Sequence, residues 1–154
     1  LTTHSALDSA PAFNPNGSNQ IAFVSTRDGD PEIYVMNAVP EGAGNQPVKL
    51  TDNNREDRNP SFSLNGQQIV FASNRDNAAS PDIYVMDANG GNPRRVTTSG
   101  GNDDPAFSPD GGSIVFVSTR FGASNPEIFV INADGQNEVR LTTNATVDAF
   151  PDWR

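Results

Sequence analysis

An internal repeat constrains this sequence more than any other feature. Four prolines, Pro11, Pro60, Pro105 and Pro151, follow one another at spacings of 49, 45 and 46 residues. The copy at 105–142 divides into four short runs separated by turn residues. Apolar side chains alternate within its second run, which is the period-2 pattern of a strand. Repeats of this length predict an array of similar supersecondary units.

The copies match along all four runs. An aromatic residue follows each proline by two positions, the second run ends in Ser-x-Arg, and the third run begins with an acidic residue. Four short strands per roughly 45 residues are typical of a β-propeller blade. Turn signals recur too often for helices of three turns, and a β-sandwich would not repeat its sequence at fixed spacing. The sequence therefore predicts an all-β chain of four-stranded antiparallel blades, with strands expected at 105–108, 113–119, 127–132 and 138–141 in the third copy.

The whole chain, 1–154, is expected to form one propeller repeat domain. Its expected parts are blade 1 at about 11–51, blade 2 at about 60–97, blade 3 at about 105–142, and the first strand of a fourth blade at 150–154. Propellers close with about four to eight blades, so three blades leave apolar faces uncovered. We expect a partial or half propeller, completed by a longer chain or by a second copy in a six-bladed homodimer.

Composition restricts the function classes. The 13 glycines and 12 prolines in 154 residues, with 34% hydrophobic residues, indicate many turns and short strands. The net charge of −9 argues against a nucleic-acid partner, because phosphate contacts need clustered Lys and Arg. No apolar run reaches the length of a membrane span, and no signal-peptide pattern opens the sequence. The absence of cysteine rules out disulfides and thiolate metal sites.

The repeat pattern resembles that of TolB-like β-propeller repeats. The shared elements are Leu-Thr, Pro-x-aromatic, Ser-Pro-Asp-Gly, Ile-Val-Phe-x-Ser-x-Arg and an acidic residue before Ile-Tyr-Val-Met. These are WD-like repeats of exported bacterial proteins, so the resemblance implies a periplasmic or extracellular scaffold or protein-interaction module without catalytic activity. Similar propellers also precede α/β-hydrolase domains of peptidases, which is an alternative. A structural subunit of an open assembly is another.

One acidic residue follows each Leu-Thr or Val-Thr by six positions. A ring of carboxylates at one mouth of a propeller channel could bind a cation or basic groups on a partner. The alternative is that each aspartate caps a turn by accepting backbone N–H bonds. The four residues are Asp8, Asp57, Asp103 and Asp148.

A second repeated set consists of the Ser-x-Arg arginines and the acids that open the third runs. Because a hairpin brings the two together, the sequence predicts a cross-strand ion pair in each blade. Its expected role is to fix register and loop shape. The predicted pairs are Arg27 with Glu32, Arg75 with Asp82, and Arg120 with Glu127.

Calcium is a weaker hypothesis. Asp28, Asp30 and Glu32 lie around a glycine, as calcium-binding oxygens do, but the sequence lacks the downstream ligands of an EF-hand and the other copies lack the motif. No cofactor is otherwise expected. Enzyme motifs are also missing from the sequence, in which His4 is the single histidine, so no catalytic residues are assigned.

Positions at which the copies differ are candidates for binding. The first copy carries an insertion at 39–46 between its third and fourth runs, and insertions in repeat proteins often lie on a binding face. Phe121 is an apolar residue in an otherwise polar loop and is a second candidate contact.

Overall fold

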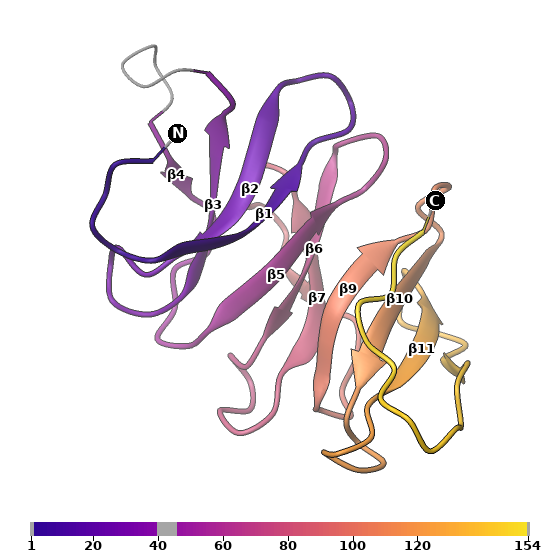
Figure 1. The fold of residues 1–154 in the computed structure, drawn as a ribbon. Helices are drawn as coiled ribbons and strands as arrows, with labels where there is room; N and C mark the ends of the chain where they lie inside the picture. Colours follow the sequence, from indigo (N-terminus) through magenta and orange to yellow (C-terminus); the bar gives the residue numbers. More distant parts are fainter. Residues whose placement is uncertain (1, 40–45, 154) are drawn as a thin grey trace.

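The computed structural model describes residues 2–39 and 46–153, and in this part the chain forms three antiparallel sheets of four strands each (Figure 1). The sheets follow the chain in order and confirm the three predicted four-stranded blades, whereas the strand predicted at 150–154 is not formed at 150–153, the part of it that the structure describes. Neighbouring strands within each sheet are consecutive in sequence, as expected of up-and-down blades. No helix in the described residues is long and apolar enough to cross a membrane.

The strands of the three blades have closely similar lengths. Blade 1 contains β1 (Asp8–Phe13), β2 (Gln20–Ser25), β3 (Glu32–Asn37) and β4 (Val48–Lys49). Blade 2 contains β5 (Asp57–Phe62), β6 (Gln68–Ser73), β7 (Asp82–Asp87) and β8 (Arg94–Arg95). Blade 3 contains β9 (Asn102–Phe107), β10 (Ser113–Ser118), β11 (Glu127–Asn132) and β12 (Val139–Arg140).

The first strand of each blade begins three residues before its proline, earlier than the sequence predicted. A β-bulge explains the difference, because the register shifts beside each of these prolines. The residue before each proline is left-handed, with φ of 47° at Ala10, 51° at Asn59 and 48° at Asp104. A bulge leaves one residue unpaired and lets the strand continue past a proline that has no N–H to donate.

The first strands form the innermost row of the array. β1 contacts β5, and β5 contacts β9, so the three blades lie side by side with their sheets facing one another (Figure 1). The insertion at 39–46, a predicted binding loop, falls largely at 40–45, outside the described residues.

Two apolar cores lie between the blades. Aliphatic residues of one blade pack against aromatic and aliphatic residues of the next. Between blades 1 and 2 the core consists of Ala22, Val24, Ile33 and Val35 against Phe62, Ile69, Phe71, Tyr84 and Met86. Between blades 2 and 3 it consists of Val70, Ala72, Ile83, Val85 and Val96 against Phe107, Ile114, Phe116, Phe129 and Ile131.

Position in the array therefore decides how deeply an equivalent residue is buried. Phe62 and Phe107 are each 7% exposed, whereas Phe13 at the same position of blade 1 is 58% exposed. Blades 2 and 3 have a preceding blade to cover this aromatic ring, and Phe13 lacks that cover among the described residues.

This contrast provides a stability test. Phe62→Ala should lower the free energy of unfolding by about 3–5 kcal/mol, because it empties a position in the core between two blades. Phe13→Ala is the matched control and should cost less than about 1 kcal/mol. Urea unfolding followed by tryptophan fluorescence and circular dichroism would measure both, and equal losses would contradict the assignment of the core.

Candidate functional site

Each blade carries the same polar unit at one end, which we call the loop face and define by Arg27, Arg75 and Arg120. In all three blades the arginine Nε donates to the serine two residues earlier, at 2.9 Å. The guanidinium also lies over two aromatic rings; that of Arg75 is 5.2 Å from the centre of Phe71 and 4.9 Å from that of Tyr84. Such cation–π contacts hold each arginine against its own blade.

The predicted pairing of these arginines was wrong. Arg27 binds Asp8 at 3.2 Å and Arg75 binds Asp57 at 2.9 Å, so each pairs with the first strand of its blade. Arg120 donates to the Asn102 side chain at 2.9 Å. The Arg27 and Arg75 side chains thus reach the first strand, whereas Arg120 contacts both Asn102 and Glu138, which lies just before β12.

The acids that open the third strands are buried at the junction between blades. Glu32, Asp82 and Glu127 have 0%, 2% and 0% of their surface exposed. Their basic partners come from the fourth strand of the same blade, with nitrogen–oxygen distances of 3.9 Å from Lys49 to Glu32, 2.5 Å from Arg95 to Asp82 and 2.6 Å from Arg140 to Glu127. A carboxylate can stay charged in such a place only when it is paired and hydrogen-bonded.

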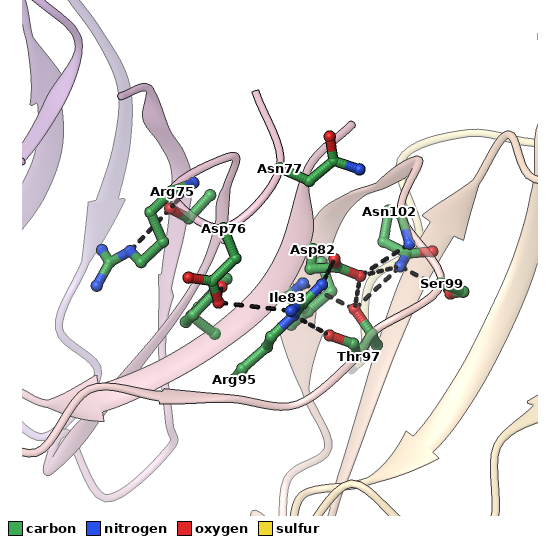
Figure 2. A network of polar contacts seen from close by, with 12 residues as sticks. Arg75, Asp76, Asn77, Asp82, Ile83, Arg95, Thr97, Ser99 and Asn102 are labelled. Atoms are coloured by element: carbon green, nitrogen blue, oxygen red, sulfur yellow. Dashed lines mark hydrogen bonds and ion pairs between the residues drawn. The ribbon is translucent and has the colours of Figure 1, made fainter. Parts of the chain in front are cut away.

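Asp82 shows the complete arrangement (Figure 2). Its Oδ1 accepts from Thr97 Oγ1 at 2.8 Å, Gly100 N at 3.0 Å and Asn102 Nδ2 at 2.9 Å, while Oδ2 accepts from Arg95. Because Asn102 begins β9, this carboxylate joins the third strand of blade 2 to the first strand of blade 3. The same Asn102 uses its oxygen to accept from Arg120, so one amide satisfies both neighbours.

The junction between blades 1 and 2 has a carboxylate where the second junction has an amide. Asp57 takes the place of Asn102, and the described structure gives its buried Oδ1 no hydrogen-bond partner. Asn53 bridges the two acids, since its Nδ2 lies 2.7 Å from Asp57 Oδ2 and 3.4 Å from Glu32 Oε2. Burial, together with the neighbouring Asp57 carboxyl, raises the pKa of Glu32 to about 7, although bonds from Thr51 and Asn53 oppose the shift.

The four aspartates predicted to form a carboxylate ring do not all occupy the same repeat position, and one of them is fully buried. Counting from the prolines, the residue equivalent to Asp8, Asp57 and Asp148 is Asn102, so Asp103 lies one position out of phase. The side chain of Asp57 is 0% exposed and has no surface for a partner. Asp148 accepts from Asn144 Nδ2 at 2.7 Å, as Asp57 does from Asn53.

Asp103 lies instead beside a second site, which we call the axial groove and which Asn59, Asp104 and Asp152 help to line. The Asp103 carboxylate accepts from Arg58 Nε at 3.0 Å and from Asn59 Nδ2 at 2.9 Å. The adjacent Asp104 accepts from the same Asn59 amide at 2.6 Å, and both burial and the Asp103 charge raise the pKa of Asp104. Residues around the four repeat prolines line this groove, a shallow cavity of about 340 Å³ that Asp152 also borders.

Comparison with the other two blades explains why an apolar residue stands at Phe121. In blades 1 and 2 the equivalent residues are Asp28 and Asp76, which accept hydrogen bonds from the hydroxyls of Tyr34 and Tyr84. Blade 3 replaces both members: Phe121 stacks on Phe129 with centroids 6.1 Å apart, and Arg140 lies 4.6 Å from the Phe121 centroid. Phe121 nevertheless stays 63% exposed, so its role as a contact remains a prediction.

Two of the three calcium candidates, Asp28 and Glu32, lie within 4 Å of the Lys49 ammonium group. Asp28 accepts from the Tyr34 hydroxyl and lies 3.8 Å from Lys49, while Glu32 is buried beside Asn53. Asp30 has one buried oxygen, Oδ2, without a hydrogen-bond partner among the described residues. Across 2–39 and 46–153, no group of three or more His, Cys, Asp or Glu side chains is placed to hold a metal ion.

Three radially arranged four-stranded sheets with a repeated loop-face unit define the β-propeller class. A family model described as the TolB beta propeller domain matches residues 1–104. The chain therefore belongs to the TolB β-propeller family.

Comparison with individual proteins agrees with this family. The Tol-Pal system protein TolB of Desulfosudis oleivorans is 36% identical over 67 residues, which are 44% of this chain and 14% of that protein. The crystal structure of TolB from Acinetobacter baumannii has a TM-score of 0.76 and 28% identity, covering 94% of this chain and 34% of its own. Dipeptidyl peptidase 4 of Porphyromonas gingivalis shares the fold alone, with a TM-score of 0.62, 22% identity, and 85% and 18% coverage. The chain thus spans a minor part of each relative.

The Glu32–Asp57 pair predicts an unusual pH dependence. Since the folded pKa of Glu32 is about 7 and its ordinary value is 4.5, the folded state holds this proton more tightly than the unfolded state. The contribution of Glu32 to stability should therefore fall as pH rises from about 4.5 to 7, by about 1–3 kcal/mol, and then level off. Urea unfolding at pH 5 and pH 8 would measure this.

Two reciprocal variants isolate the pair. Asp57→Asn should reduce the loss between pH 5 and 8, because it removes the neighbouring carboxyl but leaves Glu32 buried, and its amide can donate to Glu32 and accept from Arg75 as Asn102 does at its own junction. Asn102→Asp should introduce a similar loss at the second junction. An unchanged pH profile in both variants would contradict the shared environment of the two carboxyls.

Blade 3 has Phe121 and Phe129 where the other blades have a hydrogen-bonded Asp–Tyr pair, which predicts a coupling energy between these two positions. Phe121→Asp and Phe129→Tyr should each destabilise blade 3, since each introduces a polar group without its partner. The double variant should recover about 1 kcal/mol relative to the sum, because it rebuilds the bond seen in blades 1 and 2. A double-mutant cycle by urea unfolding tests this, and strict additivity would contradict it.

Proposed function

We propose that this chain is a non-catalytic protein-interaction module of an exported, periplasmic bacterial protein. The location is what its family implies. The axial groove is its contact surface, and a partner segment with Lys or Arg side chains is its ligand. The observation that carries this proposal is the arrangement of Asp103 and Asp104, which Asn59 and Arg58 hold at the surface of an open cavity.

Charge supports a basic partner. The chain has a net charge of −9, and Asp152 adds a third carboxylate to the rim of the groove. Arg58 pairs with Asp103 but is itself 35% exposed and also contacts Glu56 at 3.1 Å, so a partner's guanidinium or ammonium group can compete for the Asp103 carboxylate. No bound cofactor is part of the proposal.

The alternative of a propeller that serves a peptidase rests on the fold it shares with peptidases such as that of Porphyromonas gingivalis. In that case the groove would admit substrate to a catalytic domain elsewhere in a longer protein. The two proposals differ in whether the chain binds an extended peptide by itself.

Binding should be measurable with a defined probe. We expect a fluorescent peptide of alternating Ser and Lys to bind the chain at low ionic strength and to dissociate as salt increases. Asp103→Asn combined with Asp104→Asn should weaken binding about tenfold, equivalent to roughly 1.4 kcal/mol. Fluorescence anisotropy would report both effects.

The control variant combines Asp52→Asn and Asp134→Asn, which make the same change in net charge away from the groove. It should bind nearly as well as the unaltered chain. Equal weakening in both double variants would mean that only overall charge matters and would overturn the groove as the binding site.

A further inference from the structure

Three asparagines in this chain are followed by glycine, and all three lie in turns. Asn16 is in the turn between β1 and β2, Asn65 in that between β5 and β6, and Asn89 in that between β7 and β8. An Asn-Gly step can react with itself, because glycine has no side chain to shield its backbone nitrogen from the neighbouring side-chain amide. The reaction converts asparagine to an acid, and local structure decides which of the three steps undergoes it.

The three asparagine side chains are held in the same way. In each turn the side-chain oxygen accepts a hydrogen bond from the backbone nitrogen two residues later, as in an Asx turn. The distances are 2.8 Å from Ser18 to Asn16, 3.0 Å from Gln67 to Asn65 and 2.9 Å from Gly91 to Asn89. A bond to this oxygen draws electrons from Cγ and favours attack on that atom. The side chains therefore do not distinguish the three steps.

The glycine nitrogens do distinguish them. Gly66 N donates to Ser63 O and Gly90 N donates to Asp87 O, both at 2.8 Å. Gly17 N donates no hydrogen bond of normal length and angle among the described residues. The nitrogen must give up its proton to attack, so a glycine whose N–H is bonded within its turn is the poorer nucleophile.

The missing bond follows from the length of the turn. Between β1 and β2 the turn spans 14–19, one residue more than the turns at 63–67 and 108–112. Both shorter turns form the glycine bond, since Gly111 N also donates to Ser108 O at 2.8 Å. The additional residue of blade 1 is Asn19, which has φ of 60°.

Gly17 is also open to solvent. A Cβ at Gly66 would clash with the side chains of Asn14 and Asn16, and one at Gly90 would lie 2.9 Å from Leu50 O. In the described structure nothing lies within 4 Å of the same position at Gly17. The equivalent glycine of blade 3 is equally open although a blade precedes it, so a preceding blade alone does not cover this place. Water and hydroxide therefore reach the Gly17 nitrogen.

We propose that Asn16 is a site of spontaneous deamidation in the folded protein. The Gly17 nitrogen forms a bond to Asn16 Cγ as it loses its proton, while the Cγ–Nδ2 bond breaks and Nδ2 takes up a proton and leaves as ammonia. Water then hydrolyses the cyclic imide at either carbonyl, which gives aspartate or isoaspartate. Water is the only co-reactant. This inference rests on the turn and is independent of peptide binding at the axial groove.

Deamidation changes the contact between the tips of blades 1 and 2. Asn16 Nδ2 donates to Asn65 O at 3.4 Å, beside the 3.3 Å bond from Asn14 Nδ2 to Gly66 O. A carboxylate at position 16 cannot donate and would face the carbonyl oxygen that the amide had bound. Isoaspartate also adds a carbon to the main chain of the turn. The reaction therefore loosens the two tips while leaving the apolar core between the blades intact.

The rates at the three steps in the full chain test the proposal. After incubation at mildly alkaline pH, peptide mapping by mass spectrometry should show Asn16 converting about tenfold faster than Asn65 or Asn89. In guanidinium chloride the turns are lost and the three rates should converge. Isoaspartate should be found in the peptide that contains Asn16. Equal rates in the folded chain would overturn the proposal, as would the same rate difference in denaturant, since neighbouring sequence would then set the rates.

Deleting Asn19 tests the structural cause. The deletion gives blade 1 the shorter turn of the other blades, so Gly17 N should gain a bond to Asn14 O and Asn16 should react about tenfold more slowly. Asn19→Gly is the matched control, because it keeps the length of the turn and suits the positive φ, and it should react like the unaltered chain. An unchanged rate in a folded deletion variant would refute the role of turn length. If the deletion prevents folding, the order of the three rates in the unaltered chain still decides.

Discussion

The buried carboxylate at the start of each third strand is the interaction on which the array depends. It lies where two blades meet, out of reach of water, and must therefore be neutralised and hydrogen-bonded by protein groups. At Asp82 the fourth strand supplies Arg95, and the next blade supplies Asn102. At this junction the acid is satisfied partly by the first strand of the following blade, so the polar network and the apolar core share the same interface.

The two junctions solve this problem with different chemistry. An amide at Asn102 donates to one neighbour and accepts from the other, whereas the carboxylate of Asp57 can only accept unless a proton is shared with Glu32. We therefore expect the attachment of blade 1 to blade 2 to weaken as pH rises and Glu32 loses its proton. Identical backbone geometry thus coexists with unequal coupling between blades.

Most of the fold could be predicted from the sequence because the residue pattern of each strand occurs in several copies. The bulge could not, since a proline ordinarily marks a strand boundary and the left-handed residue before it differs between copies, being Ala10, Asn59 or Asp104. The ion-pair partners could not be predicted from the repeat pattern either. Arg75 has two acids of its own blade, Asp57 and Asp82, at plausible sequence separations, and only packing decides between them. Counting from the prolines rather than from Leu-Thr would have identified Asn102.

The shared phase of residues 8–13 and 148–153 has a consequence for how such chains can grow. Because both segments present Asp, Pro and an aromatic ring at matching places, a second copy lacking its first thirteen residues could be joined directly after Trp153 without a linker. The product would continue the repeat with no irregular join, as unequal duplication of a gene would produce. Blade number in such an array is then set by the number of units joined, with each new junction placed at the same repeat positions as the two seen here.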